Sequence, residues 1–171
     1  MIRLAFRYGW AFIFLILLQV LILNNMHLSI YVNSYVYILF ILILPFDTPG
    51  WMTLTLAFFL GLSIDAFSNT PGIHSAATVL LAFLRQYMLN IFAPRDGYER
   101  GQNPHYQYMG LPWFLVYAGV LTLIHHLALF FLEDFRMDHF FSNLFKAILS
   151  AIISVILMVI LLLVSYKPKR Q

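Results

Sequence analysis

The sequence predicts an all-α polytopic membrane protein, with six transmembrane helices in a single integral domain over residues 1–171. Of the 171 residues, 62% are hydrophobic and only 10% are charged, whereas a soluble domain carries about 25% charged residues. Such a chain cannot cover its apolar surface with polar side chains, so we expect a lipid bilayer as its solvent. The apolar residues also gather in stretches that approach the ~20 residues a hydrocarbon core requires.

The expected spans follow these apolar stretches, and the residues between them set their ends. The first span follows Arg3 and could be mistaken for a signal peptide, but no small-residue cleavage site comes after it, so we expect a retained signal anchor. The second ends at Pro45, before a turn at 47–50. The third is short, which draws Asp65 into or just below the membrane interface. The expected bounds are about 6–23, 30–46, 51–66, 73–92, 112–132 and 143–165.

The placement of charge predicts a multi-pass protein with both termini in the cytoplasm, because cytoplasmic connections carry an excess of lysine and arginine. In this orientation only Arg136 and Lys146, of 10 basic residues, lie on the outer side. The cytoplasmic set is Arg3, Arg7, Arg85, Arg95, Arg100, Lys167, Lys169 and Arg170. The outer side receives the acids Asp65, Glu133, Asp134 and Asp138. The cytoplasmic span ends receive Trp10, Trp51 and Trp113, as an aromatic belt predicts.

Several classes of function lack their motifs in this sequence. The chain has no cysteine, which excludes disulfides, thiolate metal sites and cysteine nucleophiles. It contains no HExxH, Gly-rich phosphate loop or GxSxG motif. Basic residues are not interleaved with exposed aromatics, so we expect no nucleic acid partner. We therefore expect a protein that is not an enzyme, with no catalytic residues, no metal and no cofactor.

Asp65 is the most informative polar residue, because a carboxylate at the margin of a span is costly unless it is paired, hydrated or functional. Three interpretations stay open: a hydrated interface residue, an anchor that accepts backbone N–H groups from the turn or helix that follows, or part of a ligand or partner site. Gly61 lies one helical turn earlier on the same face, where a glycine allows another helix to approach closely.

Four other polar residues near or within the spans have alternative interpretations. His74 could face Asp65 across the loop at Pro71-Gly72, or both could be hydrated. Arg85 could extend its side chain to the membrane interface or pair with a polar group in the bundle. His125 and His126 point about 100° apart on a helix, which disfavours a shared metal. We expect one of them to bond to another helix and the other to pack or to face headgroups.

The cytoplasmic loop from Pro94 to Met109 is the longest polar segment, and its charges are balanced. It is either a solvated connection or a docking surface for a cytoplasmic partner.

The pattern Gly61-Leu62-x-x-Asp65-(x)5-Pro71-Gly72, followed by an apolar helix, resembles the MreD family of rod shape-determining membrane proteins. The length, the six expected spans, the basic N-terminus and the connection from Pro45 to Pro49 are similar to that family as well. The resemblance covers the whole chain in length and topology, and only the segment from Gly61 to Gly72 is motif-like.

The resemblance implies a component of the bacterial cell-elongation machinery in the cytoplasmic (inner) membrane, with no enzymatic activity. Its implied partner is the bitopic protein MreC, bound through transmembrane helices. Further partners would be RodA, the elongation penicillin-binding protein, the actin-like MreB and membrane lipid. It also implies a six-helix fold similar to the S components of energy-coupling-factor vitamin transporters, which hold a small ligand near the outer face.

Two functions therefore follow as hypotheses. The first is a scaffold that binds MreC and helps control cell shape and peptidoglycan synthesis. The second is a ligand-binding S component, which the absence of tryptophan from the outer side disfavours. A pocket for a wall-precursor headgroup around Asp65, His74, Glu133 and Asp134 is less favoured, because these carboxylates would repel a pyrophosphate.

Overall fold

The computed structural model describes residues 2–26, 32–99, 101–134 and 139–165, with side chains described from residue 6. Several charged residues that support the expected orientation lie outside this part of the chain. They are the side chain of Arg3 and the residues Arg100, Arg136, Asp138, Lys167, Lys169 and Arg170.

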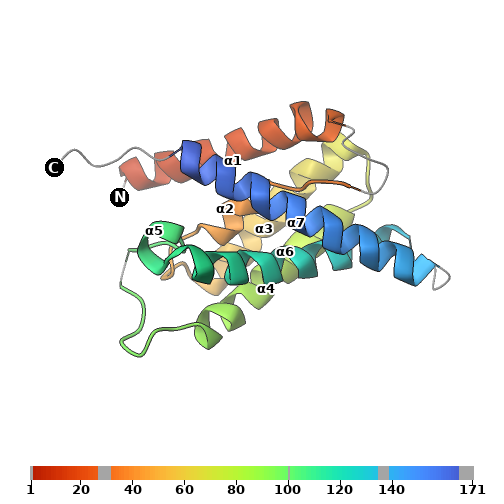
Figure 1. Ribbon diagram of the computed structural model, residues 1–171. Helices are drawn as coiled ribbons and strands as arrows, with labels where there is room; N and C mark the ends of the chain where they lie inside the picture. Colours follow the sequence, from red (N-terminus) through yellow and green to blue (C-terminus); the bar gives the residue numbers. More distant parts are fainter. Residues whose placement is uncertain (1, 27–31, 100, 135–138, 166–171) are drawn as a thin grey trace.

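The described residues form helices and connecting segments, with no β-strand among them, which confirms the all-α expectation (Figure 1). The elements are α1 (Ile2–Leu21), the 3-10 helix η1 (Leu23–Asn25), α2 (Leu39–Leu42), α3 (Gly50–Ser68), α4 (Ile73–Ile91), α5 (Tyr106–Met109), α6 (Leu111–Glu133) and α7 (Phe140–Val164).

Four of the described helices are long and apolar enough to cross a membrane, so the chain is a multi-pass membrane protein. They correspond to Phe6–Asn25, Gly50–Ser68, Leu111–Glu133 and Phe140–Val164. Their outward faces carry large exposed apolar side chains, such as Trp10, Phe58 and Phe141. Lipid is a suitable solvent for such a surface, whereas water is not.

The helix α4 has 19 residues, which is enough to span a membrane, but its composition is more polar than that of the other four. The reason is the face that it turns inward. His74, Ser75, Thr78 and Arg85 are all buried against the rest of the protein. Its outward face still presents apolar side chains such as Phe83.

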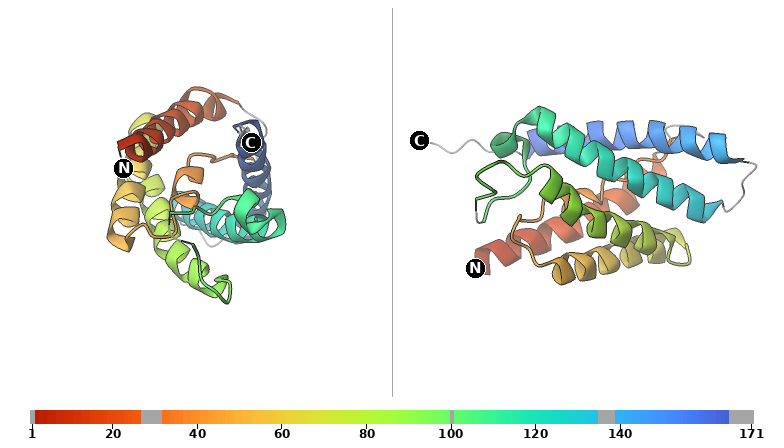
Figure 2. Two further views of the ribbon diagram at one scale, coloured as in Figure 1. Left: turned by 90° about the vertical axis from the view of Figure 1, so that its left-hand side faces the viewer. Right: turned by 90° about the horizontal axis from the view of Figure 1, so that it is seen from below.

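The prediction of a transmembrane helix at about 30–46 is wrong for the described residues 32–46. Only α2 is helical there, and the backbone from 33 to 36 is irregular. Residues 32–46 lie in the middle of the bundle, where the five long helices surround them (Figure 2). We call residues 32–46 the central segment. Its side chains from Val36 to Leu42 are almost fully buried, so protein, not lipid, surrounds it.

A non-helical backbone is tolerated at membrane depth only where other protein groups satisfy its N–H and C=O groups. In the first half of the central segment, the side chain of Gln19 on α1 provides much of this. Its amide oxygen accepts the N–H of Val36 at 2.8 Å, and its amide nitrogen donates to the carbonyl of Ser34 at 2.9 Å. From α7, the hydroxyl of Ser150 accepts the Asn33 N–H at 3.1 Å, and that of Ser154 accepts the Tyr35 N–H at 2.9 Å.

In the second half, Arg85 and Tyr117 bond to carbonyl groups at the end of α2 and just beyond it. The Arg85 Nη2 donates to the carbonyl of Leu44 at 2.5 Å, and its Nε donates to the Tyr117 hydroxyl at 3.1 Å. That hydroxyl in turn donates to the carbonyl of Leu42 at 3.0 Å. Arg85 is 0% exposed. Of the two interpretations of Arg85, extension of its side chain to the membrane interface is therefore wrong. The structure has Arg85 bonded to polar groups inside the bundle.

The helices α3 and α4 pack closely because Gly61 has no side chain. A Cβ added there would lie 2.5 Å from the Cα of Ser75 and 2.7 Å from the carbonyl oxygen of His74. These are backbone atoms, so they cannot move without displacing α4. The close approach holds Asp65, one turn further along α3, against the first turn of α4.

We predict that Gly61→Ala lowers the free energy of unfolding by about 1–3 kcal/mol, the usual effect of overpacking a tight contact. The measurement is thermal or denaturant unfolding of the purified protein in detergent, followed by circular dichroism. Gly119→Ala on α6 is the matched control, because nothing lies within 4 Å of its added Cβ. Equal stability of the Gly61 variant and the control would contradict the close contact.

Candidate functional site

Asp65 is an anchor for the start of α4. Its Oδ1 accepts the N–H of His74 at 3.0 Å and the hydroxyl of Thr70 at 2.6 Å. Its Oδ2 accepts both the N–H and the hydroxyl of Ser75, at 2.9 Å and 2.6 Å. The carboxylate thus binds N–H groups in the first turn of α4, where the helix dipole also favours an anion.

The turn between α3 and α4 brings these groups together through two residues of positive φ. Asn69 ends α3 with φ 55°, and Gly72 precedes α4 with φ 87°, a conformation that glycine adopts at no steric cost. Asp65 is only 3% exposed, and its oxygens are occupied by bonds within this turn. Of the three interpretations of Asp65, the geometry matches the anchor, not the hydrated or ligand-binding residue.

His74 does not face Asp65 with its imidazole ring. Only its backbone bonds to the carboxylate, and the ring turns into the bundle, where Nδ1 lies 3.2 Å from the hydroxyl of Tyr37. That hydroxyl also lies 3.1 Å from Oγ1 of Thr78 and 2.9 Å from Nε2 of His125. The Thr78 hydroxyl donates to the carbonyl of His74 at 2.6 Å. The Tyr37 hydroxyl is therefore free to donate to Thr78 and to accept from both imidazoles.

Both histidines of α6 are fully buried, so neither of them faces headgroups. His125 bonds to Tyr37 of the central segment. His126 donates from Nδ1 to the carbonyl of Thr122 at 2.8 Å, and its Nε2 lies 3.2 Å from the hydroxyl of Ser154 on α7. Each histidine thus links α6 to a different neighbour, and the two rings do not converge on one point.

The sequence reasoning missed Gln19, Tyr37, Tyr117, Ser150 and Ser154. All five lie within apolar stretches, and each is buried in the bundle. The signal that could have found them is a polar residue at mid-span, which in lipid needs a partner. Ser150 and Ser154 also share one face of α7 at a four-residue spacing, which marks a face that contacts something polar.

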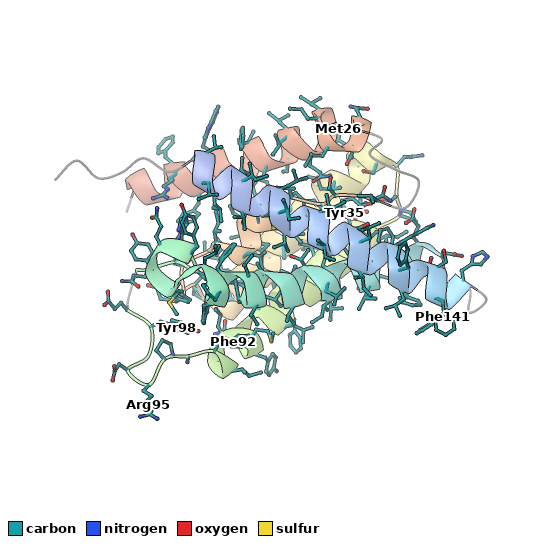
Figure 3. All side chains as sticks on the ribbon, viewed as in Figure 1. Met26, Tyr35, Phe92, Arg95, Tyr98 and Phe141 are labelled. Atoms are coloured by element: carbon teal, nitrogen blue, oxygen red, sulfur yellow. The ribbon has the colours of Figure 1, made fainter. Side chains whose placement is uncertain are left out.

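A polar cavity of about 230 Å³ lies at the end of the bundle where α3 turns into α4. We call it the end cavity. Its walls come from η1, the start of the central segment, the α3–α4 turn and the end of α6. Figure 3 labels Met26 and Tyr35, which both line it. The described residues that line it are Leu23, Asn24, Met26, Val32, Asn33, Ser34, Tyr35, Ser68, Thr70, His74 and Glu133.

A second, larger cavity of about 800 Å³ is a largely apolar groove between α1 and α3, near the opposite end. We call it the α1–α3 groove. Gly9 and Phe12 of α1 form one wall, and Met52 and Leu56 of α3 form another. The end is closed by Leu44, Pro45, Asp47, Thr48 and Pro49. Asp47 also lines the groove and is exposed. Its side chain makes no hydrogen bond or ion pair within the described part of the chain.

The loop between α4 and α5 folds back onto the bundle through an aromatic cluster. The ring of Tyr98 stacks on Phe46 with centroids 3.9 Å apart, and its hydroxyl donates to the carbonyl of Leu89 at 2.8 Å. Burial raises the pKa of Tyr98 to about 12. Trp113 adds edge contacts to both rings. Arg95 lies at the far tip of the loop (Figure 3). The loop is therefore anchored to the bundle near Tyr98, and its tip is exposed.

The same loop carries a second partly buried group, His105, at the start of α5. Its Nδ1 accepts the N–H of Gln107 at 3.3 Å. Burial, with a smaller contribution from the positive charge of Arg7, lowers the pKa of His105. The loop therefore lies close to the first turns of α1.

Within the described residues, no group of three or more His, Asp or Glu side chains is placed to hold a metal ion. The fold and these sites define a helical membrane protein whose long helices enclose a largely non-helical central segment. No family model, no curated protein and no solved structure matches this chain.

We predict that Asp65→Asn mainly lowers the yield and stability of folded protein. The asparagine side chain has only one acceptor oxygen, and its NH2 group would face two donors that now bond to a carboxylate oxygen. Each buried group left without a partner costs about 1–3 kcal/mol. Thermal unfolding in detergent measures this loss, with Asp47→Asn as the exposed control. If the Asp65 variant folded as stably as the original protein, the anchor role would be wrong.

Proposed function

We propose that the chain is a non-enzymatic membrane scaffold of the MreD family, which binds the transmembrane helix of MreC in the cytoplasmic membrane of a bacterium. In this proposal the five long helices and the central segment each cross the membrane, which gives six passes. The arrangement is similar to an S component, and both termini face the cytoplasm. RodA, the elongation penicillin-binding protein and MreB would be further members of the same assembly.

The observation that carries the proposal is the α1–α3 groove. Helix α1 is the most loosely packed of the long helices, and the groove that it leaves against α3 is mostly apolar along its length. Asp47 stands at the end that the proposed orientation places in the cytoplasm. A partner helix carries its basic residues at that same end under the positive-inside rule, so a charge pair can form there.

The buried polar groups are consistent with a scaffold, because most of them serve the fold. Asp65, Arg85, Gln19 and Tyr37 each bond to backbone or side-chain groups of this chain. None of the side chains described pairs a nucleophile with an oriented base and an open position for a substrate, as a catalytic site requires.

We predict that MreC co-purifies with this chain in mild detergent and that Gly9→Leu weakens the association severalfold or more. The added side chain would occupy the groove, in which Gly9 has nothing within 4 Å of an added Cβ. Gly119→Leu, on α6 and equally open, is the matched control and should leave the association unchanged. If this chain and MreC were both folded and did not associate, the proposal that MreC is the partner would be wrong. Equal effects of the two variants on the association would contradict the α1–α3 groove as the binding site.

A second candidate is a small-ligand-binding S component of a vitamin transporter, and the end cavity is the observation that favours it. The cavity lies at the outer face in the proposed orientation and is lined mainly by polar groups. Ligand-dependent stabilisation of the purified chain by a vitamin, in the absence of MreC, would favour this candidate over the scaffold.

A further inference from the structure

The end cavity contains a polar group that the fold leaves unused. Ser34 lines the cavity and is only 5% exposed, yet its hydroxyl has no hydrogen-bond partner within the described part of the chain. A buried hydroxyl without a partner is destabilising, by about 1–3 kcal/mol. The lining hydroxyls of Thr70 and Ser68 differ, since Thr70 donates to Asp65 and Ser68 accepts from Asn24 at 3.4 Å. Ser34 therefore contributes an unpaired hydroxyl group to the wall of the cavity.

The charge around the cavity favours a cation. Glu133 is the only acidic or basic side chain, apart from the imidazole of His74, among the described residues that line it. The carboxyl ends of α3 and α6 lie at its wall, through Ser68 and Glu133, and carry the negative ends of their helix dipoles. One helix N-terminus is nearby, that of α4, but its N–H groups at His74 and Ser75 are already bound to Asp65.

The shape and lining set the size and chemistry of the molecule. A volume of about 230 Å³ holds about eight waters at ~30 Å³ each, or an organic molecule of similar size. The ring of Tyr35 stands at the wall, in edge contact with that of His74 at 5.1 Å between centroids. An aromatic ring and a carboxylate together are suited to an ammonium group. Asn24 and Asn33 add further polar groups for hydroxyl or ester oxygens.

We propose that the end cavity binds a small organic ammonium ion, with Glu133 pairing with the cation and Ser34 bonding to a neighbouring polar atom. Two sources supply this chemistry at a membrane surface, a free amine or the ethanolamine headgroup of a lipid. The inference goes beyond partner binding and does not depend on it. The groove and the cavity lie toward opposite ends of the bundle, so either function can fail without the other.

The test uses the full chain in nanodiscs of phosphatidylglycerol, with thermal unfolding as the readout. Three probes of nearly equal size separate charge from shape: tyramine as the cation, tyrosol as the neutral alcohol and 4-hydroxyphenylacetate as the anion. We expect tyramine to stabilise the protein most. Glu133→Gln should weaken its apparent affinity by about tenfold or more, as for the loss of one charge-assisted hydrogen bond. Glu99→Gln, in the loop at the other end, is the matched control and should have no effect.

Ser34→Ala separates a ligand contact from a structural role. Because its hydroxyl has no partner in the described residues, the variant should unfold no earlier than the original protein without probe, yet bind tyramine more weakly. A second arm replaces phosphatidylglycerol by phosphatidylethanolamine. If the headgroup is the source, these nanodiscs stabilise the protein, and Glu133→Gln removes that gain. Equal effects of the three probes, or no effect of tyramine together with no difference between the lipids, would overturn the proposal.

Discussion

The structure depends on one constraint: a backbone that passes through the bundle without forming a continuous helix must find part of its hydrogen bonds elsewhere in the protein. The central segment meets it with side chains from four surrounding helices. Gln19, Ser154, Arg85 and Tyr117 come from α1, α7, α4 and α6, and each bonds to the segment directly. In lipid an unsatisfied backbone group costs several kcal/mol, so these bonds fix both the path of the segment and the positions of the helices around it.

The inward placement of polar residues follows from this constraint and decides where function can reside. Residues such as Asp65 and His125, which by type could form a catalytic site, are engaged in anchoring a turn or holding Tyr37. Two open regions lie toward opposite ends of the bundle. One end has the polar cavity with the unpartnered Ser34, and the other has the apolar groove with Asp47. The proposed scaffold and the proposed ligand site use one of these regions each.

Composition and apolar runs predicted the helical membrane class, and Gly61 predicted the close helix contact, because both signals are local. The central segment was not predictable in the same way. Its residues from Val36 to Leu44 are as apolar as a spanning helix, and a short buried run does not reveal its backbone conformation. The sequence also left Arg85 with two interpretations for the same reason, since its carbonyl partners belong to that irregular segment. The anchor role of Asp65 stood among the alternatives, but only the turn geometry distinguishes it.

The stability of Gln19→Met tests the central claim most directly, because methionine keeps the side chain's volume and removes its hydrogen bonds. The account predicts a large loss of unfolding free energy in micelles, about 1–3 kcal/mol for each of the freed groups at Val36 and Ser34. Gln86→Met, on the exposed face of α4, should leave stability unchanged. If residues 32–46 formed an ordinary spanning helix, their backbone would be satisfied internally. Gln19→Met would then be neutral or stabilising, and that result would contradict the account.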